Sequence, residues 1–529
     1  MPLISKVGRN TSRTRIALAV VYLLLTLGGL TMVYPFLLMV ATAMKGATDQ
    51  NDNRVIPVYW KQDYELFRKY VDDKYAGMVD TAAWFYGHED ATALMSSTQT
   101  EEPVPVNPMT DSEVWRYEKF LSEMPLDWWQ VGFRIGPGRI SSKVNGKYQD
   151  FLRERYKTVA AINEIYIEQN IVFQTVEPPA ERFTSGKWRS AGDRKWKDWL
   201  EFKARLGPQY RIPITVQGQW RQYLRSTYNN QFNRVPAETR GTAETFEQIA
   251  PDSELPEFRK FYANKLPLRY RGNNPDKKWR AMTGEKTLPQ ARYDAAHVQR
   301  EASPMRKEYS IKNYAFVLDY ILLHGRAVWN TFLFCLLAVL THLIVNPLAA
   351  YALSRYNLPA AGKILLFLLA TMAFPAEVTM IPGFLLLRDL GLLNTFAALV
   401  LPAAASGYSI YLLKGFFDSL PRDLYENAEI EGARETTMLF RITLPLSKPV
   451  LAVIALTSFM AAYSAFMFAF LVAQDERMWT ITVWIYQLQS RAPKGVLMAA
   501  LTLAAIPTLI VFLAAQRVIL RGIILPGEK

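Results

Sequence analysis

The stretch Asp423-Leu-Tyr-Glu426-Asn-Ala428-Glu-Ile-Glu431-Gly432-Ala433, followed by Ile442-Thr-Leu444-Pro445, lies between two long apolar segments. Acidic residues just after Pro421 and the glycine beyond them predict a short helix over 423–430 that stops at Gly432. A second amphipathic stretch, 436–444, is expected to form another helix that ends before Pro445. Two short helices joined at a glycine predict a compact knob between membrane spans.

The apolar segments around this knob are long enough to cross a membrane, which takes about 20 residues. Ile16–Ala43, near the start of the chain, also qualifies. Ala41-Thr-Ala43 imitates a signal-peptide cleavage site, but the apolar run is longer than a signal core of about 7–15 residues, so we expect an uncleaved anchor. The expected spans are 16–43, 327–354, 363–386, 395–414, 448–473 and 496–517. The sequence therefore predicts an all-α membrane protein with six transmembrane helices.

Basic residues orient these spans, because cytoplasmic loops carry an excess of lysine and arginine. The residues that fall together on one side are those of the N-terminus, Arg355, Lys363, Arg422, Arg434, Arg441, Lys448, Arg517 and Arg521. We therefore expect both termini in the cytoplasm. The predicted organisation is 1–45 as N-terminus and first span, 46–325 as an extracytoplasmic insert, and 326–529 as a five-helix core that carries the cytoplasmic loop 417–448.

Composition excludes several classes of function. The net charge of +13 comes from basic residues scattered along the chain without a recognisable nucleic-acid-binding module, so we expect no nucleic-acid partner. The single cysteine, Cys335, allows no intrachain disulfide, and the four histidines are far apart in the sequence. The sequence therefore predicts neither a metal site nor a cofactor.

Polar residues inside the expected spans are candidates for a solute path. Asn346 and Pro347 interrupt the second span, and Glu377 lies between two prolines in the third. Broken helices are tolerated where they line protein or a wet cavity, and an ionisable intramembrane residue is a candidate for a pathway. The alternative for Glu377 is a position at the headgroup level, where it is simply hydrated.

The knob resembles the coupling loop of ABC importer permeases, the EAA motif with its glycine, a nine-residue spacer and I-x-L-P. The matching residues are Glu426, Ala428, Glu431, Gly432, Ala433, Ile442, Leu444 and Pro445. Asn427 stands where alanine is usual, and Glu431 where aspartate is usual. Further segments resemble carbohydrate permeases of the MalG type: Tyr34-Pro-Phe36 with Lys45, Asn330-Thr331, 349–356, Ile381-Pro382 and 391–395.

This resemblance covers residues 1–46 and 308–529, about half the chain, and implies a sugar importer permease in the bacterial cytoplasmic (inner) membrane. In that family the coupling loop sits in a cleft of a cytoplasmic ATPase dimer, a second permease completes the pore, and an extracytoplasmic binding protein delivers the sugar. The sequence has no G-x-x-x-x-G-K-[ST] phosphate loop, so we expect a transport subunit within membrane lipid rather than an enzyme.

The insert carries a weak internal repeat with a period of roughly 70–80 residues. Its units pair the segments 68–75, 149–156 and 221–228 with the later segments 117–125, 199–208 and 258–267. Helical spacing of the aromatic residues predicts small helical modules. We expect the insert to be a docking platform for a binding protein or a partner permease, with direct carbohydrate contact as the alternative.

Two other functions stay open at this point. The same machine could import another polar solute, because a coupling loop encodes docking and not cargo. A membrane-anchored extracytoplasmic enzyme or sensor, with the insert as its working part, is the other alternative.

Overall fold

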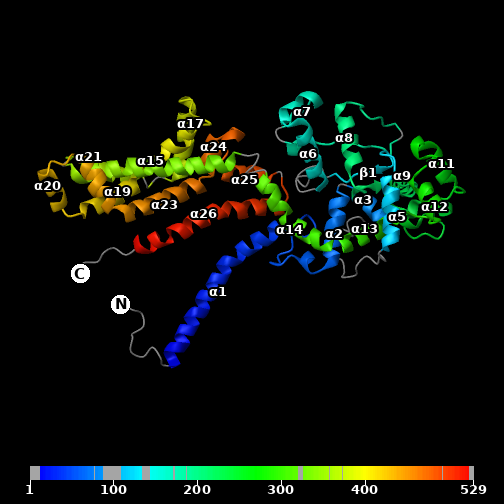
Figure 1. Cartoon of the computed structure of the whole chain (residues 1–529), viewed down its shortest axis with the longest axis horizontal. Coiled ribbons are helices and arrows are strands. Elements are labelled where there is room, and N and C mark those ends of the chain that lie inside the picture. The colour runs from blue at the N-terminus through cyan, green and yellow to red at the C-terminus, as the bar shows by residue number, and fades with distance from the viewer. Residues whose placement is uncertain are drawn as a thin grey trace. The chain divides into compact units, whose positions relative to one another are not determined.

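The computed structural model describes residues 12–76, 78–86, 109–133, 143–170, 173–185, 187–319, 326–356, 358–371, 373, 375–490 and 492–522. The chain divides into two compact units, which are described separately. The insert unit comprises Met1–Phe316 and Arg491–Ala499, and the membrane unit comprises Val317–Ser490 and Ala500–Lys529. The described residues are mostly helical, as expected (Figure 1).

The insert unit begins with the long apolar helix α1 (Ser12–Ala43). Its other helices are α2 (Asp63–Lys74), α3 (Val79–Tyr86), α5 (Asp111–Ser122), α6 (Lys143–Tyr156), α7 (Val159–Tyr166), α8 (Arg194–Arg205), α9 (Val216–Thr227), α10 (Ala237–Arg240), α11 (Pro256–Asn264), α12 (Pro275–Thr283), α13 (Gln290–Arg300) and α14 (Ala302–Leu318). Two short strands, β1 (Trp129–Gln130) and β2 (Ile212–Pro213), pair antiparallel. Single 3₁₀ turns are η1 (Val58–Trp60), η3 (Phe173–Thr175), η4 (Pro208–Tyr210), η5 (Phe232–Arg234), η6 (Phe246–Gln248) and η7 (Leu268–Tyr270).

The end of α1 is fastened to the rest of the insert unit by polar contacts. The Asn313 amide of α14 donates to the carbonyl oxygens of Ala43 and Lys45, which have no partner within the helix because they lie at its end and just after it. The Lys45 side chain is buried, and its ammonium donates to the carbonyl oxygens of Asp52 and Arg54. The segment that leaves α1 is therefore held by both ends of the insert.

A buried carboxylate, Asp294 on α13, ties the base of the insert together. It accepts hydrogen bonds from the Lys74 ammonium at 2.5 Å, from the hydroxyls of Tyr75 and Tyr86 at 2.9 and 2.6 Å, and from the Gln290 amide at 2.9 Å. Asp294 is 0% exposed. A buried charge is tolerated only with such pairing, so this cluster joins α2, α3 and α13 into one core.

A buried lysine likewise connects several segments in the middle of the insert. Lys203 on α8 is 0% exposed and donates to the carbonyl oxygens of Leu126 and Trp129 and to the Glu181 carboxylate. Its ammonium also lies 4.4 Å from the centre of the Trp129 ring, a cation–π contact. The short strand β1 is thereby connected to α8.

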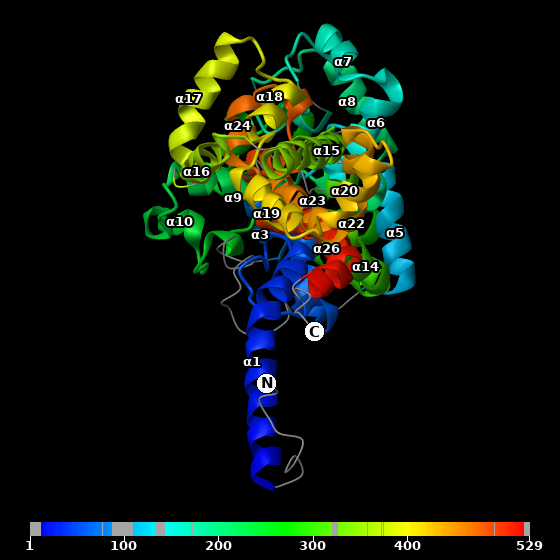
Figure 2. The ribbon, with the colours of Figure 1, turned by 90° about the vertical axis from the view of Figure 1, so that its left-hand side faces the viewer.

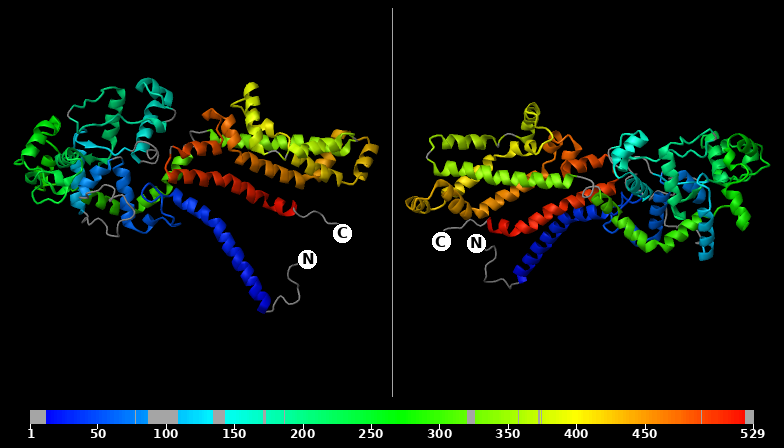
Figure 3. Two further views of the ribbon diagram at one scale, coloured as in Figure 1. Left: turned by 180° about the vertical axis from the view of Figure 1, so that it is seen from behind. Right: turned by 45° about the horizontal axis from the view of Figure 1, so that its top comes forward.

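Two helix pairs of the insert place aromatic rings in nearly the same arrangement. In the pair α6 and α8, Tyr148 meets Trp199 edge to face at 5.2 Å and an interplanar angle of 89°. In the pair α9 and α11, Trp220 meets Phe258 at 5.2 Å and 86°. The two helix pairs lie in different parts of the insert (Figures 1 and 3), and their rings belong to one continuous hydrophobic core. The repeat, which stays a prediction, would explain this agreement, because the matching rings occupy equivalent sequence positions.

The membrane unit is built around α15 (Ala327–Arg355), which packs along α19 (Gly407–Asp418) and α23 (Lys448–Ser464) (Figure 1). Its other helices are α16 (Ala361–Thr371), α17 (Ala376–Asp389), α18 (Phe396–Val400), α20 (Asp423–Ile430), α21 (Glu435–Thr437), α22 (Leu444–Leu446), α24 (Met467–Val472), α25 (Ile481–Gln489) and α26 (Lys494–Gly522), the last of which begins in the other unit. Shorter turns are the 3₁₀ helices η9 (Leu401–Ala403) and η11 (Glu476–Met478) and the π-helix η10 (Met438–Thr443).

Three of the described helices are long and apolar enough to span a membrane unbroken: Thr14–Ala43, Ala327–Arg355 and Lys494–Gln516. Two further candidates are bent pairs, Phe396–Ala403 with Gly407–Asp418 and Glu435–Leu446 with Lys448–Ser464. The expected span 363–386 is instead divided between α16 and α17, because Pro375, which precedes α17, has an extended backbone with a ψ of 136°. The number of six spans stays a prediction.

Candidate functional site

The knob predicted at 423–433 has the local geometry that its sequence indicates. Helix α20 spans Asp423–Ile430, with Asp423 and Glu426 in its first turn, where carboxylates interact favourably with the helix dipole. Gly432 has a φ of 76°, a conformation that costs an L-residue about 1–2 kcal/mol. The Ala433 N–H donates to the Ala428 carbonyl and the Gly432 N–H to the Glu429 carbonyl, the two bonds of a Schellman motif. The predicted stop at Gly432 is confirmed.

The second helix of the knob differs from the prediction at its end. It begins at Glu435 and continues through Pro445 to Leu446, so the expectation that it ends before Pro445 is wrong. The six residues Met438–Thr443 form a π-helical segment, and Pro445 follows at the start of a new turn. Proline is tolerated in a first turn because its missing N–H is not needed there. The chain then bends by 80° into α23.

One side of the knob packs on the end of α15. Ala428, Ala433, Ile442 and Leu444 are partly buried against a core that includes Ala350, Tyr351, Leu413 and Phe417. Small side chains at 428 and 433 allow this close packing. Four of the eight motif residues therefore hold the knob in place.

A buried polar pair connects the two helices of the knob. The hydroxyls of Tyr425 and Thr443 are 2.8 Å apart, and both residues are buried. The Arg355 guanidinium lies 3.6 Å from the centre of the Tyr425 ring, and it also donates to the Phe417 carbonyl. The motif comparison missed Tyr425 and Thr443. Tyr425 is the one aromatic residue of α20, and this was the only sequence signal for a buried position there.

Two hydrogen bonds add to the attachment of the knob. The Tyr351 hydroxyl of α15 donates to the Glu435 carboxylate at 2.7 Å, and the Ser354 hydroxyl donates to Asp418 at 2.6 Å. These bonds join the end of α15 to both segments that flank α20. Movement of the knob would therefore be passed directly to α15.

The other side of the knob is exposed. Glu426, Glu431, Gly432 and Pro445 are all exposed, together with the large apolar side chains of Ile430 (84% exposed) and Phe440 (62% exposed). Ile430 and Phe440 lie outside the motif, and the sequence did not predict a functional part for them. Helix α20 lies at one end of the membrane unit, and Figure 2 looks onto that end. A projecting end with carboxylates around two exposed apolar side chains is suited to a protein partner.

The two candidates for a solute path lie outside the knob. Asn346 on α15 is 0% exposed; its carbonyl oxygen accepts from the Ser406 N–H at 2.8 Å, and its amide donates to His342. Glu377 lies in the first turn of α17, but its side chain is outside the described residues. The structure does not bring the two into one described site, and their part in a path stays a prediction.

Among the residues described, no group of three or more histidine, cysteine, aspartate or glutamate side chains is arranged to hold a metal ion. The buried Cys335 has a free thiol.

The sequence that forms this knob matches a known protein family. Residues 345–525, which include the whole knob, match the family described as "Binding-protein-dependent transport system inner membrane component". The trehalose/maltose transport system permease protein MalG of Thermococcus litoralis is 36% identical over 222 residues, which cover 40% of this chain and 79% of that protein. The probable ABC transporter permease protein YurM of Bacillus subtilis is 34% identical over 36% of this chain and 64% of its own length.

A solved bacterial ABC transporter, involved in the import of the acidic polysaccharide alginate, shares 27% sequence identity with the chain. The alignment covers 39% of this chain and 78% of that one, with a TM-score of 0.35. The family match begins at residue 345 and so leaves the insert at 46–325 outside it. The chain belongs to the family of binding-protein-dependent transport system inner membrane components, the non-enzymatic permease subunits of ABC transporters.

Proposed function

We propose that this chain translocates a sugar or oligosaccharide across the cytoplasmic membrane by alternating access, driven by a separate cytoplasmic ATPase dimer that binds the loop 417–448. A second permease subunit completes the path, and an extracytoplasmic binding protein delivers the solute. Six spans place both termini in the cytoplasm and residues 46–325 outside it.

The division of the knob into two sides is the observation that carries this proposal. Its inner side is fixed on α15 by the contact of Arg355 with the Tyr425 ring, by the hydrogen bond from Tyr351 to Glu435 and by the small residues. Its outer side presents Glu426, Ile430 and Phe440 to solvent. The knob is attached to a long membrane helix on one side and is exposed to solvent on the other. It can therefore transmit the motion of a bound partner to that helix. The membrane helix α15 is the element that would receive this motion.

Carbohydrate is the cargo that we propose, because the names of several relatives specify it. Besides trehalose and maltose, these names include polygalacturonan and rhamnogalacturonan, sulfoquinovosyl glycerol and diacetylchitobiose. The diversity of these solutes within one family agrees with a coupling loop that encodes docking rather than cargo.

The test is a pull-down of the tagged chain from detergent-solubilised native membranes, with a variant that carries Glu426→Ala and Gly432→Asp. The native chain should bring down an ATPase and a second permease. The amount of ATPase recovered with the variant should be at least tenfold lower, because the substitutions disturb the exposed knob. The amount of the second permease should be unchanged, because the rest of the chain is intact. The matched control is Asp389→Ala, which removes an exposed carboxylate of α17 that is paired with its neighbour Arg388.

A second readout is sugar uptake by cells that carry Gly432→Ala. No atom lies within 4 Å of the position a Cβ would take at Gly432, so this variant tests backbone strain and not a clash. Uptake should fall at least tenfold at unchanged membrane levels, whereas Gly415→Ala, on α19 with equal room and ordinary helical geometry, should keep it. Normal uptake by the Gly432 variant, or the absence of an ATPase from both pull-downs, would contradict the proposal.

A further inference from the structure

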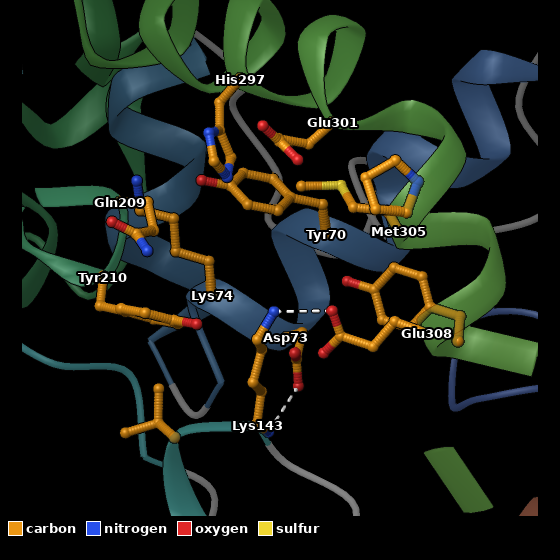
Figure 4. A pocket seen from close by; sticks show the side chains of 13 residues that line it. Tyr70, Asp73, Lys74, Lys143, Gln209, Tyr210, His297, Glu301, Met305 and Glu308 are labelled. Atoms are coloured by element: carbon orange, nitrogen blue, oxygen red, sulfur yellow. Dashed lines mark hydrogen bonds and ion pairs between the residues drawn. The ribbon is translucent and has the colours of Figure 1, made fainter. Parts of the chain in front are cut away.

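The insert contains a polar cavity of about 260 Å³, at the place where α2, the start of α6, the turn η4 and the helices α13 and α14 meet. Gln209 and Tyr210 lie on one side, Met305 and Glu308 on the other, and His297 and Glu301 above them (Figure 4). Its volume is just below the range of about 300–1,000 Å³ that is typical of pockets for drug-sized ligands. The cavity therefore suits a smaller molecule, of the size of one sugar ring.

Most of the charges around this cavity are already paired. The Lys143 ammonium donates to Glu308 at 2.7 Å, Lys312 pairs with Asp73 at 3.1 Å, and Lys74 pairs with the buried Asp294. Lys74, Lys143, Asp73 and Glu308 of these pairs line the cavity, and their two positive and two negative charges cancel.

Two polar side chains of the wall have no such partner. Within the described residues, neither the Glu301 carboxylate nor the Gln209 amide makes a side-chain hydrogen bond or an ion pair, although both line the cavity. Glu301 is exposed and Gln209 is partly buried, so both side chains are open to solvent at the cavity. Here they are available to a ligand, and the unpaired carboxylate of Glu301 disfavours an anion.

Aromatic rings complete the wall. Tyr70, Tyr210 and Tyr309 all line the cavity, and the ring centre of Tyr70 lies 5.5 Å from that of His297. Burial, reinforced by the nearby Lys74, lowers the pKa of His297, so its ring is neutral near pH 7 and can both donate and accept a hydrogen bond. Amphipathic rings beside paired hydrogen-bonding groups match a molecule that has C–H faces and hydroxyl edges.

We propose that this cavity binds an uncharged, hydroxyl-rich ligand of the size of a single sugar ring. The hydroxyls of the ligand would bond to Glu301, Gln209 and the paired carboxylates, and its C–H face would lie against Tyr210. The proposal goes beyond transport, because the cavity lies in the insert and outside the residues that match the transporter family. Binding here requires no ATPase and no second permease.

The experiment is isothermal titration calorimetry on the full chain in lipid nanodiscs, with glucose, galactose, mannose and N-acetylglucosamine as neutral probes and glucuronate as the anionic probe. At least one neutral sugar should bind saturably, and glucuronate should bind at least tenfold more weakly than the neutral sugar of the same ring. Failure of all four neutral sugars to bind, or tighter binding of glucuronate, would overturn the proposal.

Variants locate the bound sugar. Glu301→Ala and Tyr210→Ala should each weaken binding at least tenfold, whereas Glu238→Gln, an exposed carboxylate of α10, should leave it unchanged. Because Glu301 is exposed, Glu301→Ala keeps the test valid if Tyr210→Ala unfolds the insert. Sugar binding that neither variant weakens lies elsewhere and also overturns the proposal. Gly432→Ala should leave binding unchanged, so this proposal and the transport proposal can fail separately.

Discussion

The insert and the membrane unit achieve their stability in different ways. The insert buries large aromatic side chains, among them Trp129, Trp199 and Trp220, around buried ion pairs such as Lys74 with Asp294. The membrane unit buries small residues at its helix contacts, such as Ala350, Ala398 and Ala469, and leaves large apolar side chains exposed on its outer surface. In a membrane, helix association depends on close packing of small residues, since lipid is as apolar as leucine.

This difference indicates the solvent in which each unit is stable. The insert has a core of its own and needs water outside it. The membrane unit has a thin core with exposed apolar side chains such as Phe332, Ile344 and Leu509, which require lipid or another subunit to cover them. The two units should therefore respond differently to the loss of one buried polar group, and the mutations below compare them directly.

The largest effect is expected for Asp294→Asn at the base of the insert. The substitution leaves the Lys74 ammonium buried without a counter-charge and removes an acceptor from two tyrosine hydroxyls. Breaking a buried pair in this way costs about 3–5 kcal/mol. Thermal unfolding followed by tryptophan fluorescence would measure it, because ten of the thirteen tryptophans lie in residues 46–325.

A double variant and a control make this test specific. Lys74→Met added to Asp294→Asn should recover part of the loss, because an apolar pair of similar volume replaces a buried ion pair at little cost. Glu238→Gln, on the exposed face of α10, should change stability by less than about 0.5 kcal/mol. If Asp294→Asn were equally harmless, the contrast between the two units would be wrong.

A smaller effect is expected in the membrane unit from Asn346→Leu. The Asn346 side chain accepts from the Ser406 N–H, which lies at the break between η9 and α19, and a leucine leaves that donor without its partner. Hydrogen bonds between membrane helices contribute about 0.6 kcal/mol on average and up to roughly 1.7 kcal/mol. We therefore expect a loss of about 1 kcal/mol, far less than at Asp294.

Hydrogen exchange of the peptide around residue 406, measured by mass spectrometry in detergent, is the appropriate readout, since it should become faster in the variant. Thr341→Val is the control, because the Thr341 hydroxyl bonds only within its own helix, to Leu337. Unchanged exchange at 406 would show that the break is held by the surrounding packing and not by Asn346.

The features of the knob could be predicted because their signals are local. The acidic first turn of α20 and the glycine at 432 determine its two ends within a few residues, and the observed bounds equal the predicted ones. The continuation through Pro445 could not be predicted, because it depends on a π-helical segment whose buried side chains pack on α15. Tertiary packing there outweighs the usual effect of a proline.

The buried polar cluster around Asp294 could not be predicted from the sequence. Asp294 and Tyr70 are separated by 224 residues in the sequence, and no local pattern indicates that they meet. The same holds for the cavity, whose wall combines α2 with α14. Aromatic spacing predicted helical modules there, but not which charges would become buried between them.

The smallest effects test whether the insert is a true repeat. The Tyr156 hydroxyl donates to Asp198, which precedes Trp199, and the Tyr228 hydroxyl donates at 2.5 Å to Glu257, which precedes Phe258. These contacts are equivalent if the helix pairs α6 with α8 and α9 with α11 are repeats. Tyr156→Phe and Tyr228→Phe should then each lower the free energy of unfolding by about 0.5–1 kcal/mol, the low end for a hydrogen bond, because both tyrosines are only partly buried.

The two losses should also add within about 0.5 kcal/mol in the double variant, because the pairs share no partner. The matched control comes from the repeat itself: Tyr223 is the equivalent of Phe151, so Tyr223→Phe should be nearly neutral. Denaturant unfolding followed by tryptophan fluorescence gives all four values. Unequal losses, or a costly Tyr223→Phe, would mean that the two ring clusters resemble each other by chance, since equivalent positions in a repeat must tolerate each other's residues.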